Sequence, residues 1–389
     1  MLRSEPKPIV PKAVQTLLLV GPKPPPIGGP GLTIQAIMGE LAKNYPSIRL
    51  KLINTSPLRD HRKKQKGFNF EKVFRTIMVM PKYLWEVRRC DSIIVITNNL
   101  FTFTVVPIMI AFARFFRKPF FLKPVGGDLD LDLDSLWKPF RNYQLAILRS
   151  ADGILVQTQL LQASLKAMGC PKALYLPGFR TMPIVKEERK NESDGISLVY
   201  LGHIMRAKGP LVLLEALQIL EKCGNVHVTC DFYGPIHYEV REDFLRQLEL
   251  TPSVQYCGEA EPGSGASLIA AYDALVLPTY FVSEGHTGVL IEAMHVGVPV
   301  ISTWHRAIPE LITDGENGLL VPTHDSQALA DAIRRMAQDR SLRKKMGRAN
   351  FLRGKEFLSG NVVARLLKMV LPAQKTVFFR ESGISRDEG

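Results

Sequence analysis

Two glutamates, Glu284 and Glu292, stand eight positions apart and are well suited to binding or catalysis. Glu284 lies in a glycine-containing loop, SEGHTG. Glu292 is the only charged residue of the apolar segment VLIEAMHV, where a carboxylate needs a partner or a solvent-facing position. Sugar or ribose hydroxyl groups would be suitable donors to it. The alternatives are a solvated helix face for Glu292 and an ordinary loop carboxylate near a helix N-terminus for Glu284.

Two cations occupy another loop. Arg206 and Lys208 lie between an apolar segment, 196–201, and a helix that we expect to begin at Pro210. Such a loop could neutralise a diphosphate, because cations and first-turn amide groups both favour bound phosphate. The amide groups of the SEGHTG loop offer similar contacts. The alternative is that both cations are surface charges at a helix end.

The segments around the two glutamates alternate between strand and helix patterns. Residues 274–277 predict a buried strand, and 289–296 predict a helix. Gly297 is placed to end that helix, because glycine tolerates the left-handed conformation of a helix cap. Residues 298–301 predict the next strand. The glutamates therefore lie at the carboxyl end of one strand and in the helix that follows it.

The beginning of the chain repeats this arrangement. A predicted strand at 14–20 leads into a loop rich in glycine and proline, 21–31, and a predicted helix at 32–41. Glycine lets a backbone approach a ligand closely, and this place in a Rossmann-like unit is where phosphate or sugar is expected. The loop lacks the GxGxxG pattern of dinucleotide sites. The alternative is a tight loop with only a structural role.

The segments SEGHTGVLIEAMHVGVPVI and IPELITDGENGLLVP resemble the signature of the retaining, group 1 type glycosyltransferases of family 4. The resemblance implies an α/β chain of GT-B architecture, with two Rossmann-like domains facing each other across a cleft. It also implies a nucleotide-sugar donor and retention of anomeric configuration. In this family the first glutamate approaches the donor sugar and the second holds the nucleotide ribose, roles that fall here on Glu284 and Glu292.

The resemblance extends to further residues. We predict catalytic roles for Glu284, Lys208 and Arg206, and an acceptor-side role for Asp128. No cofactor or metal is predicted, since the nucleotide-sugar is a substrate. The predicted donor-binding residues are Gly28, Gly29, His203, Gly258, Gly285, His286, Thr287, Gly288, Val289, Glu292 and Glu310.

The chain departs from the family pattern at three positions. His203 stands where an arginine is usual, and Val125 stands where a histidine is usual. The usual asparagine is absent between Pro177 and Gly178. Either Arg206 supplies the missing guanidinium or the site uses His203, and the sequence leaves both open.

Two further patterns bear on metal sites. The alternating segment LDLDLD at 129–134 invites comparison with the DxD motif, which holds manganese in another glycosyltransferase architecture. No other feature supports that architecture, so we expect a solvated loop with a few buried leucines. The five cysteines are scattered without a CxxC pair, which argues against a disulfide framework or a zinc site and fits a reducing cytoplasm.

The length of 389 residues favours two domains. The net charge of +13 is uneven, because residues 1–190 hold 30 basic against 13 acidic side chains, a net +17, while the remainder carries −4. The basic half predicts an anionic partner such as a membrane surface or a phosphate-bearing lipid, with solubility charge as the alternative. The predicted divisions are an N-terminal acceptor-side domain at 1–180, a linker at 181–195, a C-terminal donor domain at 196–360, and a helix returning toward the first domain, with a tail, at 361–389.

Two segments, 73–89 and 100–116, bear on whether the chain contacts a membrane. A helix predicted at 73–89 mixes basic and aromatic residues, which suits either a membrane interface or packing on the domain. The apolar run 100–116 is shorter than the roughly 20 residues that span a bilayer, so it predicts a buried helix. The first residues lack a signal-peptide pattern. We therefore expect a cytoplasmic protein, with peripheral attachment to the inner face of the cytoplasmic membrane as a second expectation.

The sequence thus predicts a glycosyltransferase that moves a sugar from a nucleotide-sugar to a glycan or lipid-linked acceptor, in the synthesis of cell-surface polysaccharide or glycolipid. Nucleic acid is not an expected partner. Two alternatives remain open. One is a GT-B enzyme of other chemistry, a nucleotide-sugar epimerase or a phosphorylase. The other is a non-catalytic relative that binds sugar or membrane.

Overall fold

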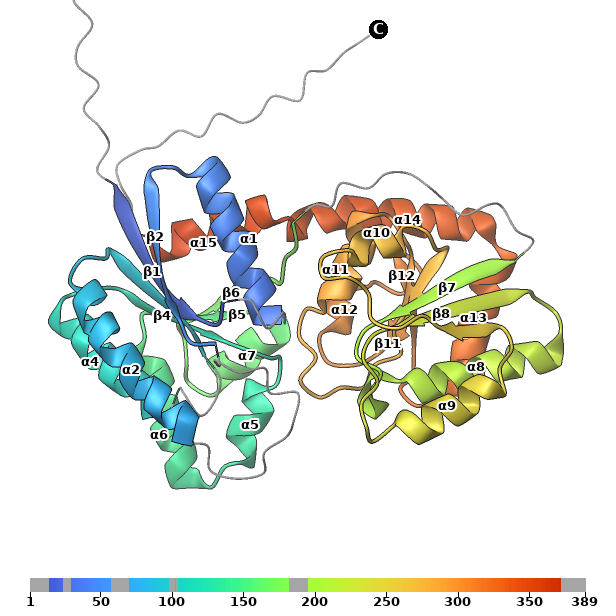
Figure 1. Cartoon of the computed structure of the whole chain (residues 1–389), viewed down its shortest axis with the longest axis horizontal. Coiled ribbons are helices and arrows are strands. Elements are labelled where there is room, and N and C mark those ends of the chain that lie inside the picture. Colours follow the sequence, from blue (N-terminus) through green and yellow to red (C-terminus); the bar gives the residue numbers. More distant parts are fainter. Residues whose placement is uncertain are drawn as a thin grey trace, which may run out of the picture.

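The structure is a computed structural model that describes residues 14–23, 29–56, 70–97, 102, 104–181 and 195–371. In this part of the chain, twelve strands form two parallel sheets of six strands each (Figure 1). The first sheet contains β1 (Gln15–Gly21), β2 (Ile48–Asn54), β3 (Ser92–Thr97), β4 (Phe120–Pro124), β5 (Gly153–Val156) and β6 (Ala173–Tyr175). The second contains β7 (Ile196–Leu201), β8 (Val228–Tyr233), β9 (Val254–Tyr256), β10 (Ala274–Val276), β11 (Val300–Thr303) and β12 (Gly318–Val321).

Both sheets are doubly wound. The strand order is β2-β1-β3-β4-β5-β6 in the first and β12-β11-β10-β7-β8-β9 in the second. In each, the order reverses beside the strand that opens the unit, which is where ligands bind in open parallel sheets. All residues of β3 and β4 are buried, as expected for central strands covered by helices on both faces.

Helices cover both faces of the first sheet. One face packs into a core around Val95 and Leu122, and the other into a core around Ile94 and Ile34. Apolar strands with crossover helices produce this layered packing. The helices are α1 (Gly29–Asn44), α2 (Phe70–Val87), α4 (Val106–Phe115), α5 (Leu129–Ser135), α6 (Lys138–Ser150) and α7 (Gln159–Ala167).

The second sheet has a single continuous core around strands β7, β10 and β11. Its longer helices are α8 (Pro210–Cys223), α9 (Arg241–Glu249), α11 (Gly288–His295), α13 (Ser326–Gln338) and α14 (Arg340–Gly354). Short helical turns are η1 (Arg206–Lys208), α10 (Gly265–Ile269), α12 (Ile308–Leu311) and η2 (Lys355–Phe357).

The chain passes between the two units twice, and the two crossings touch. The Arg180 N–H donates to the Phe357 carbonyl at 3.1 Å, and the Ser359 N–H donates to the Arg180 carbonyl at 2.9 Å. The last helix, α15 (Ser359–Val370), then packs beside α1 on the first sheet (Figure 1). Its buried Val363 and Leu366 complete the core on that face.

Several predicted elements are confirmed. The strands predicted at 14–20 and 274–277 agree within one residue at each end with β1 and β10. The apolar run at 100–116 contains helix α4, which buries one face and exposes Ile108 and Phe115 on the other. Gly297 has the left-handed conformation expected after α11. Within the described residues, no helix combines the length and apolar character needed to cross a bilayer.

The loop predicted at 129–134 is wrong, because these residues form α5. Leu129 and Leu133 lie one helical turn apart and are both buried, so the spacing of four residues outweighs the alternation of leucine and aspartate. Asp130 is also buried rather than solvated. Helices α6 and α9 lie in segments for which no helix was predicted.

Other expectations lie outside the described residues. These are Gly28, the first residues of the chain, most of the predicted linker 181–195 and the tail after 371.

Candidate functional site

Two loops of the second sheet meet at the carboxyl ends of their strands. The loop after β7 reaches Gly209, which has a left-handed φ of +76°, and a Cβ there would lie 2.1 Å from the Pro278 carbonyl oxygen. The Tyr280 N–H donates to the Ala207 carbonyl at 2.8 Å, which joins the β7 loop to the loop after β10. Glycine is required at this approach, and the approach brings Lys208 against Glu284.

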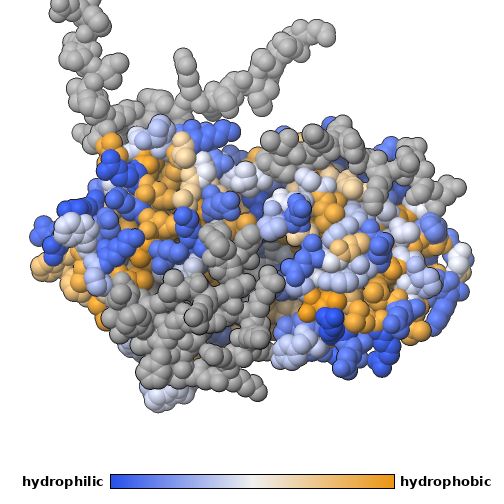
Figure 2. All heavy atoms as spheres, viewed as in Figure 1, coloured by the Kyte–Doolittle hydropathy of each residue, from blue (hydrophilic) through white to orange (hydrophobic). Residues whose placement is uncertain are grey.

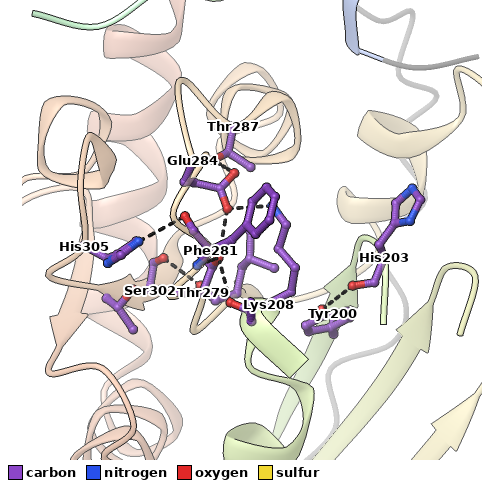
Figure 3. A network of polar contacts seen from close by, with 12 residues as sticks. Tyr200, His203, Lys208, Thr279, Phe281, Glu284, Thr287, Ser302 and His305 are labelled. Carbon is purple, nitrogen blue, oxygen red and sulfur yellow. Dashed lines mark hydrogen bonds and ion pairs between the residues drawn. The ribbon is translucent and has the colours of Figure 1, made fainter. Parts of the chain in front are cut away.

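Glu284 is the centre of a buried polar network (Figure 3). Its side chain is 6% exposed, and Oε2 accepts from Lys208 Nζ at 2.6 Å and from Thr279 Oγ1 at 2.8 Å. Oε1 accepts from Thr287 Oγ1 at 2.8 Å. Oε2 therefore accepts two hydrogen bonds, whereas Oε1 accepts one and keeps the capacity to accept another.

Lys208 keeps hydrogen-bonding capacity beyond this pair. An ammonium group has three donors, and Glu284 uses one. The Nζ atom also lies 5.1 Å from the centre of the Phe281 ring, over its face, and the Phe281 carbonyl is held by His305 Nε2 at 3.0 Å (Figure 3). Lys208 can thus bind an anion at the N-terminus of α11 without leaving Glu284.

Glu292 lies one helical turn into α11 and pairs with a residue that sequence reasoning missed. Arg180 Nε donates to Glu292 Oε1 at 3.0 Å. Burial raises the pKa of Glu292, and the Arg180 guanidinium opposes that rise. The carboxylate predicted to hold a ribose is thereby oriented by the segment that joins the two units.

In the described part of the chain, neither candidate for the missing guanidinium bonds to the Glu284 side chain. Arg206 is exposed and pairs with Asp243 Oδ2 at 2.8 Å. The exposed His203 ring points away from the Lys208–Glu284 pair, while its backbone carbonyl accepts from the Tyr200 hydroxyl at 3.0 Å (Figure 3). Donor contacts by Arg206 and His203 stay predictions.

His286 and Glu310 join the two units. The buried His286 ring accepts from the Gly178 N–H at Nδ1 over 3.3 Å, which leaves Nε2 to donate to Glu310 Oε2 at 3.1 Å. Glu310 also accepts from the N–H groups of Gln159 at 2.7 Å and Leu160 at 2.8 Å, at the N-terminus of α7. Burial would raise the pKa of Glu310, but these hydrogen bonds lower it. Both side chains were predicted to bind donor, and that role stays a prediction.

A second set of contacts joins the loop after β4 to the loop after β10. The Gly127 N–H donates to the Ser283 carbonyl at 3.1 Å, and the Ser283 hydroxyl donates to Asp128. A Cβ on Gly127 would lie 2.5 Å from the Glu284 carbonyl oxygen, so only glycine allows this approach. Asp128, predicted on the acceptor side, thus lies directly beside the donor loop.

Arg306, in the loop after β11, also bonds to the first unit near Gly127. Its NH2 group donates to Asp130 Oδ1 at 2.8 Å and to the Gly127 carbonyl at 2.5 Å. Arg306 has a φ of +46°, an uncommon conformation for a residue with a side chain and one that clusters at functional sites. Neither Arg306 nor Asp130 was among the predicted site residues.

The remaining predicted residues are distributed around this centre. Gly29 begins α1, and Gly288 begins α11, followed by Val289. Gly258 follows β9 with a φ of +82°, and its carbonyl accepts from the Gly234 N–H at 2.8 Å. In the described part of the chain, no three His, Cys, Asp or Glu side chains gather as metal ligands would.

The second unit matches a known protein family, and the whole fold resembles solved structures. Residues 183–353 match the family model described as glycosyl transferases group 1. The chain superposes on the crystal structure of Anabaena Alr3699/HepE in complex with UDP with a TM-score of 0.69, at 14% identity, over 91% of this chain and 99% of that one. The chain has the GT-B fold.

Other proteins give similar matches. A sucrose-phosphate synthase from Thermosynechococcus elongatus superposes with a TM-score of 0.68 at 17% identity, over 91% of this chain and 98% of that one. A putative colanic acid biosynthesis glycosyltransferase, WcaL, of Salmonella typhimurium is 30% identical over 192 residues, which is 47% of each chain. The chain therefore spans about half the length of the curated relatives it matches, and the family match concerns the second unit.

The contact between Arg306 and Asp130 yields a first prediction. Asp130→Asn removes a charge whose side chain is 7% exposed, and we expect it to lower the free energy of unfolding by about 2 kcal/mol. Urea unfolding measures this change, and small-angle scattering would show a larger radius of gyration if the two units separate.

Asp134→Asn is the matched control, because this aspartate lies on the same helix but is 53% exposed and pairs with Arg141 at the surface. We expect its effect to stay below about 1 kcal/mol. Equal losses in both variants would contradict a special role for the Asp130 contact.

Proposed function

We propose that this protein transfers a sugar from a nucleotide-sugar donor to a glycan or lipid-linked acceptor, with retention of the anomeric configuration, as in the glycosyltransferases of family 4. The observation that carries the proposal is the buried pair of Lys208 and Glu284, held at the N-terminus of α11 where the two units meet. The family match over 183–353 and the structural likeness to a protein solved with UDP support it.

Each charged group has a role in this proposal. Lys208 and the first amide groups of α11 bind the diphosphate, whose charge grows as it leaves the anomeric carbon. Arg206 is the predicted second cation. Glu284 fixes Lys208 and the donor sugar, and Glu292 accepts from a ribose hydroxyl. Because cationic side chains neutralise the diphosphate, the reaction needs no metal ion or other cofactor.

In the transfer step, the departing diphosphate itself acts as the base. The bond between the anomeric carbon and the diphosphate oxygen breaks, and the acceptor oxygen bonds to that carbon on the same face. The acceptor proton passes to the departing diphosphate. The contacts of Gly127, Asp128 and Arg306 across the two units keep water from the reacting carbon, which limits hydrolysis.

The two units take different substrates in this account. Residues 196–360 hold the donor, and residues 1–180 hold the acceptor, with Asp128 on the acceptor side. The name of the WcaL relative, a colanic acid biosynthesis glycosyltransferase, supports a role in the synthesis of a cell-surface polysaccharide or glycolipid. We place the reaction in the cytoplasm, at the inner face of the membrane.

A surface of α2 and α4 is suited to such a membrane. Trp85 is 56% exposed and stacks with Arg89, whose guanidinium carbon lies 4.1 Å from the ring centre. Arg88 lies over Phe116, which packs edge-on against Phe115, a residue 77% exposed. Figure 2 shows apolar surface beside hydrophilic surface at the end of the molecule that α4 occupies. Exposed aromatic rings among arginines match an anionic lipid interface.

The donor proposal is tested by thermal unfolding with UDP, GDP, ADP and their sugar conjugates, with and without magnesium. We expect one nucleotide class to stabilise the protein without metal, by about 2.7 kcal/mol at 100 times its Kd. We expect Glu292→Ala to weaken nucleotide binding about tenfold and Lys208→Ala to slow donor turnover about 100-fold.

Lys222→Ala is the control, because this exposed lysine lies in the last turn of α8, at the opposite end of that helix from the loop that carries Lys208. If both site variants left donor binding and turnover unchanged, the site assignment would be wrong. If no nucleotide stabilised the wild-type protein, the non-catalytic alternative would replace this proposal.

The membrane surface is tested by sedimentation with lipid vesicles. We expect binding to vesicles rich in phosphatidylglycerol but not to pure phosphatidylcholine, with a several-fold loss in Trp85→Ala and Phe115→Ala. Tyr238→Ala is the control, since it removes an exposed aromatic ring from the second unit. Equal binding to both lipids, or by all three variants, would exclude this surface.

A further inference from the structure

Arg180 occupies a special place in the chain. It lies where the chain first leaves the first unit for the second. Its backbone N–H and carbonyl bond to Phe357 and Ser359, where the chain returns to the first unit. Its side chain is also held, because NH1 donates to the Phe179 carbonyl at 3.0 Å. The guanidinium therefore has a fixed position at the junction of the two units.

From this position Arg180 reaches one oxygen of Glu292. Nε donates to Oε1 at 3.0 Å, whereas Oε2 has no hydrogen-bond partner among the described residues. Two glycines leave room for the pair. A Cβ on Gly288 would lie only 1.6 Å from Arg180 NH2, and a Cβ on Gly265 would lie 2.2 Å from Glu292 Oε2. Neither clash could be relieved without moving the arginine or the carboxylate.

We propose that Arg180 is a positioning residue for the donor site: it fixes Glu292 through Oε1 and leaves Oε2 to accept a hydrogen bond from the ribose of a nucleotide. This inference rests on the proposed function, because it assumes that a nucleotide binds beside Glu292. The family resemblance assigned no role to this residue. In this proposal Arg180 acts through Glu292 rather than by its own contact with the nucleotide.

The electrostatics of the site supply the reason for such a residue. A carboxylate accepts a hydroxyl hydrogen bond best when it is ionised, and burial on α11 works against ionisation. Among the described residues, Arg180 is the charged group that contacts Glu292, and α10 packs Gly265 against its Oε2. His295, near the end of α11, has its pKa lowered by burial and by the charge of Arg180, so it adds no cation near neutral pH.

Removal of Arg180 would change the pH dependence of nucleotide binding. Without Arg180, burial acts unopposed and the pKa of Glu292 rises further. A protonated Glu292 is a poorer acceptor for a ribose hydroxyl, so nucleotide binding would fail at a higher pH than in the wild-type protein. The acid limb of the binding profile would move toward neutrality.

The test measures the affinity of the full chain for UDP and for 2′,3′-dideoxy-UDP by calorimetry between pH 5 and pH 8. If the nucleotide panel selects ADP or GDP, that nucleotide and its dideoxy form are used. We expect Arg180→Met to weaken UDP binding about tenfold at pH 7 and binding of the dideoxy form less than about twofold. Arg180→Lys should recover part of the loss, because it returns the positive charge without the planar donor group.

Arg365→Met is the control, because it removes an arginine of α15 that stacks on Tyr175 and does not touch Glu292. If Arg180→Met weakens both nucleotides equally, or leaves the acid limb in place, Arg180 does not act through Glu292 and the inference falls. If Arg180→Met does not fold, Arg180→Lys decides: unchanged discrimination between the two nucleotides overturns the inference. A wild-type protein that binds none of the nucleotides would instead overturn the proposed function and this inference with it.

Discussion

A buried ion pair between Lys208 and Glu284 determines how the second unit is arranged for binding. The two residues come from loops that follow β7 and β10, and each would be a costly buried charge without the other. The hydroxyl groups of Thr279 and Thr287 also donate hydrogen bonds to the carboxylate. An anion that enters at the N-terminus of α11 therefore meets a lysine already oriented by its partner, and little reorganisation is needed on binding.

The same loop also carries the contact with the first unit. Ser283 and His286 flank Glu284, and both bond to residues of the first unit. Small residues make this possible, because a side chain at Gly127 would collide with the backbone of Glu284. Polar pairs and hydrogen bonds, rather than an apolar interface, hold the units together at this point. Such contacts can break and reform, which suits a site that must admit a donor and then exclude water.

The sequence was informative where the signal is local. The apolar runs at 14–20, 274–277 and 298–301 predict β1, β10 and β11. The loop patterns identify Lys208 and Glu284, which the structure places in contact although they are 76 positions apart. It was uninformative where the partner is distant and no local pattern exists. Arg180 lies 112 positions from Glu292, and Arg306 lies 176 positions from Asp130, so only the packing of the two units reveals these pairs. The alternating aspartates led to the wrong prediction of a solvated loop at 129–134 for the same reason. Arg306, distant in sequence, pairs with Asp130 and makes its burial tolerable.

Hydrogen–deuterium exchange with and without the nucleoside diphosphate that binds most tightly tests the central claim most directly. The claim is that the loop between Ser283 and Gly288, with the first turn of α11, is the anion site. The account predicts that the nucleotide slows exchange of these amide groups and of the loop that carries Lys208. Slower exchange confined to other segments, with amide groups 283–290 unchanged, would contradict it.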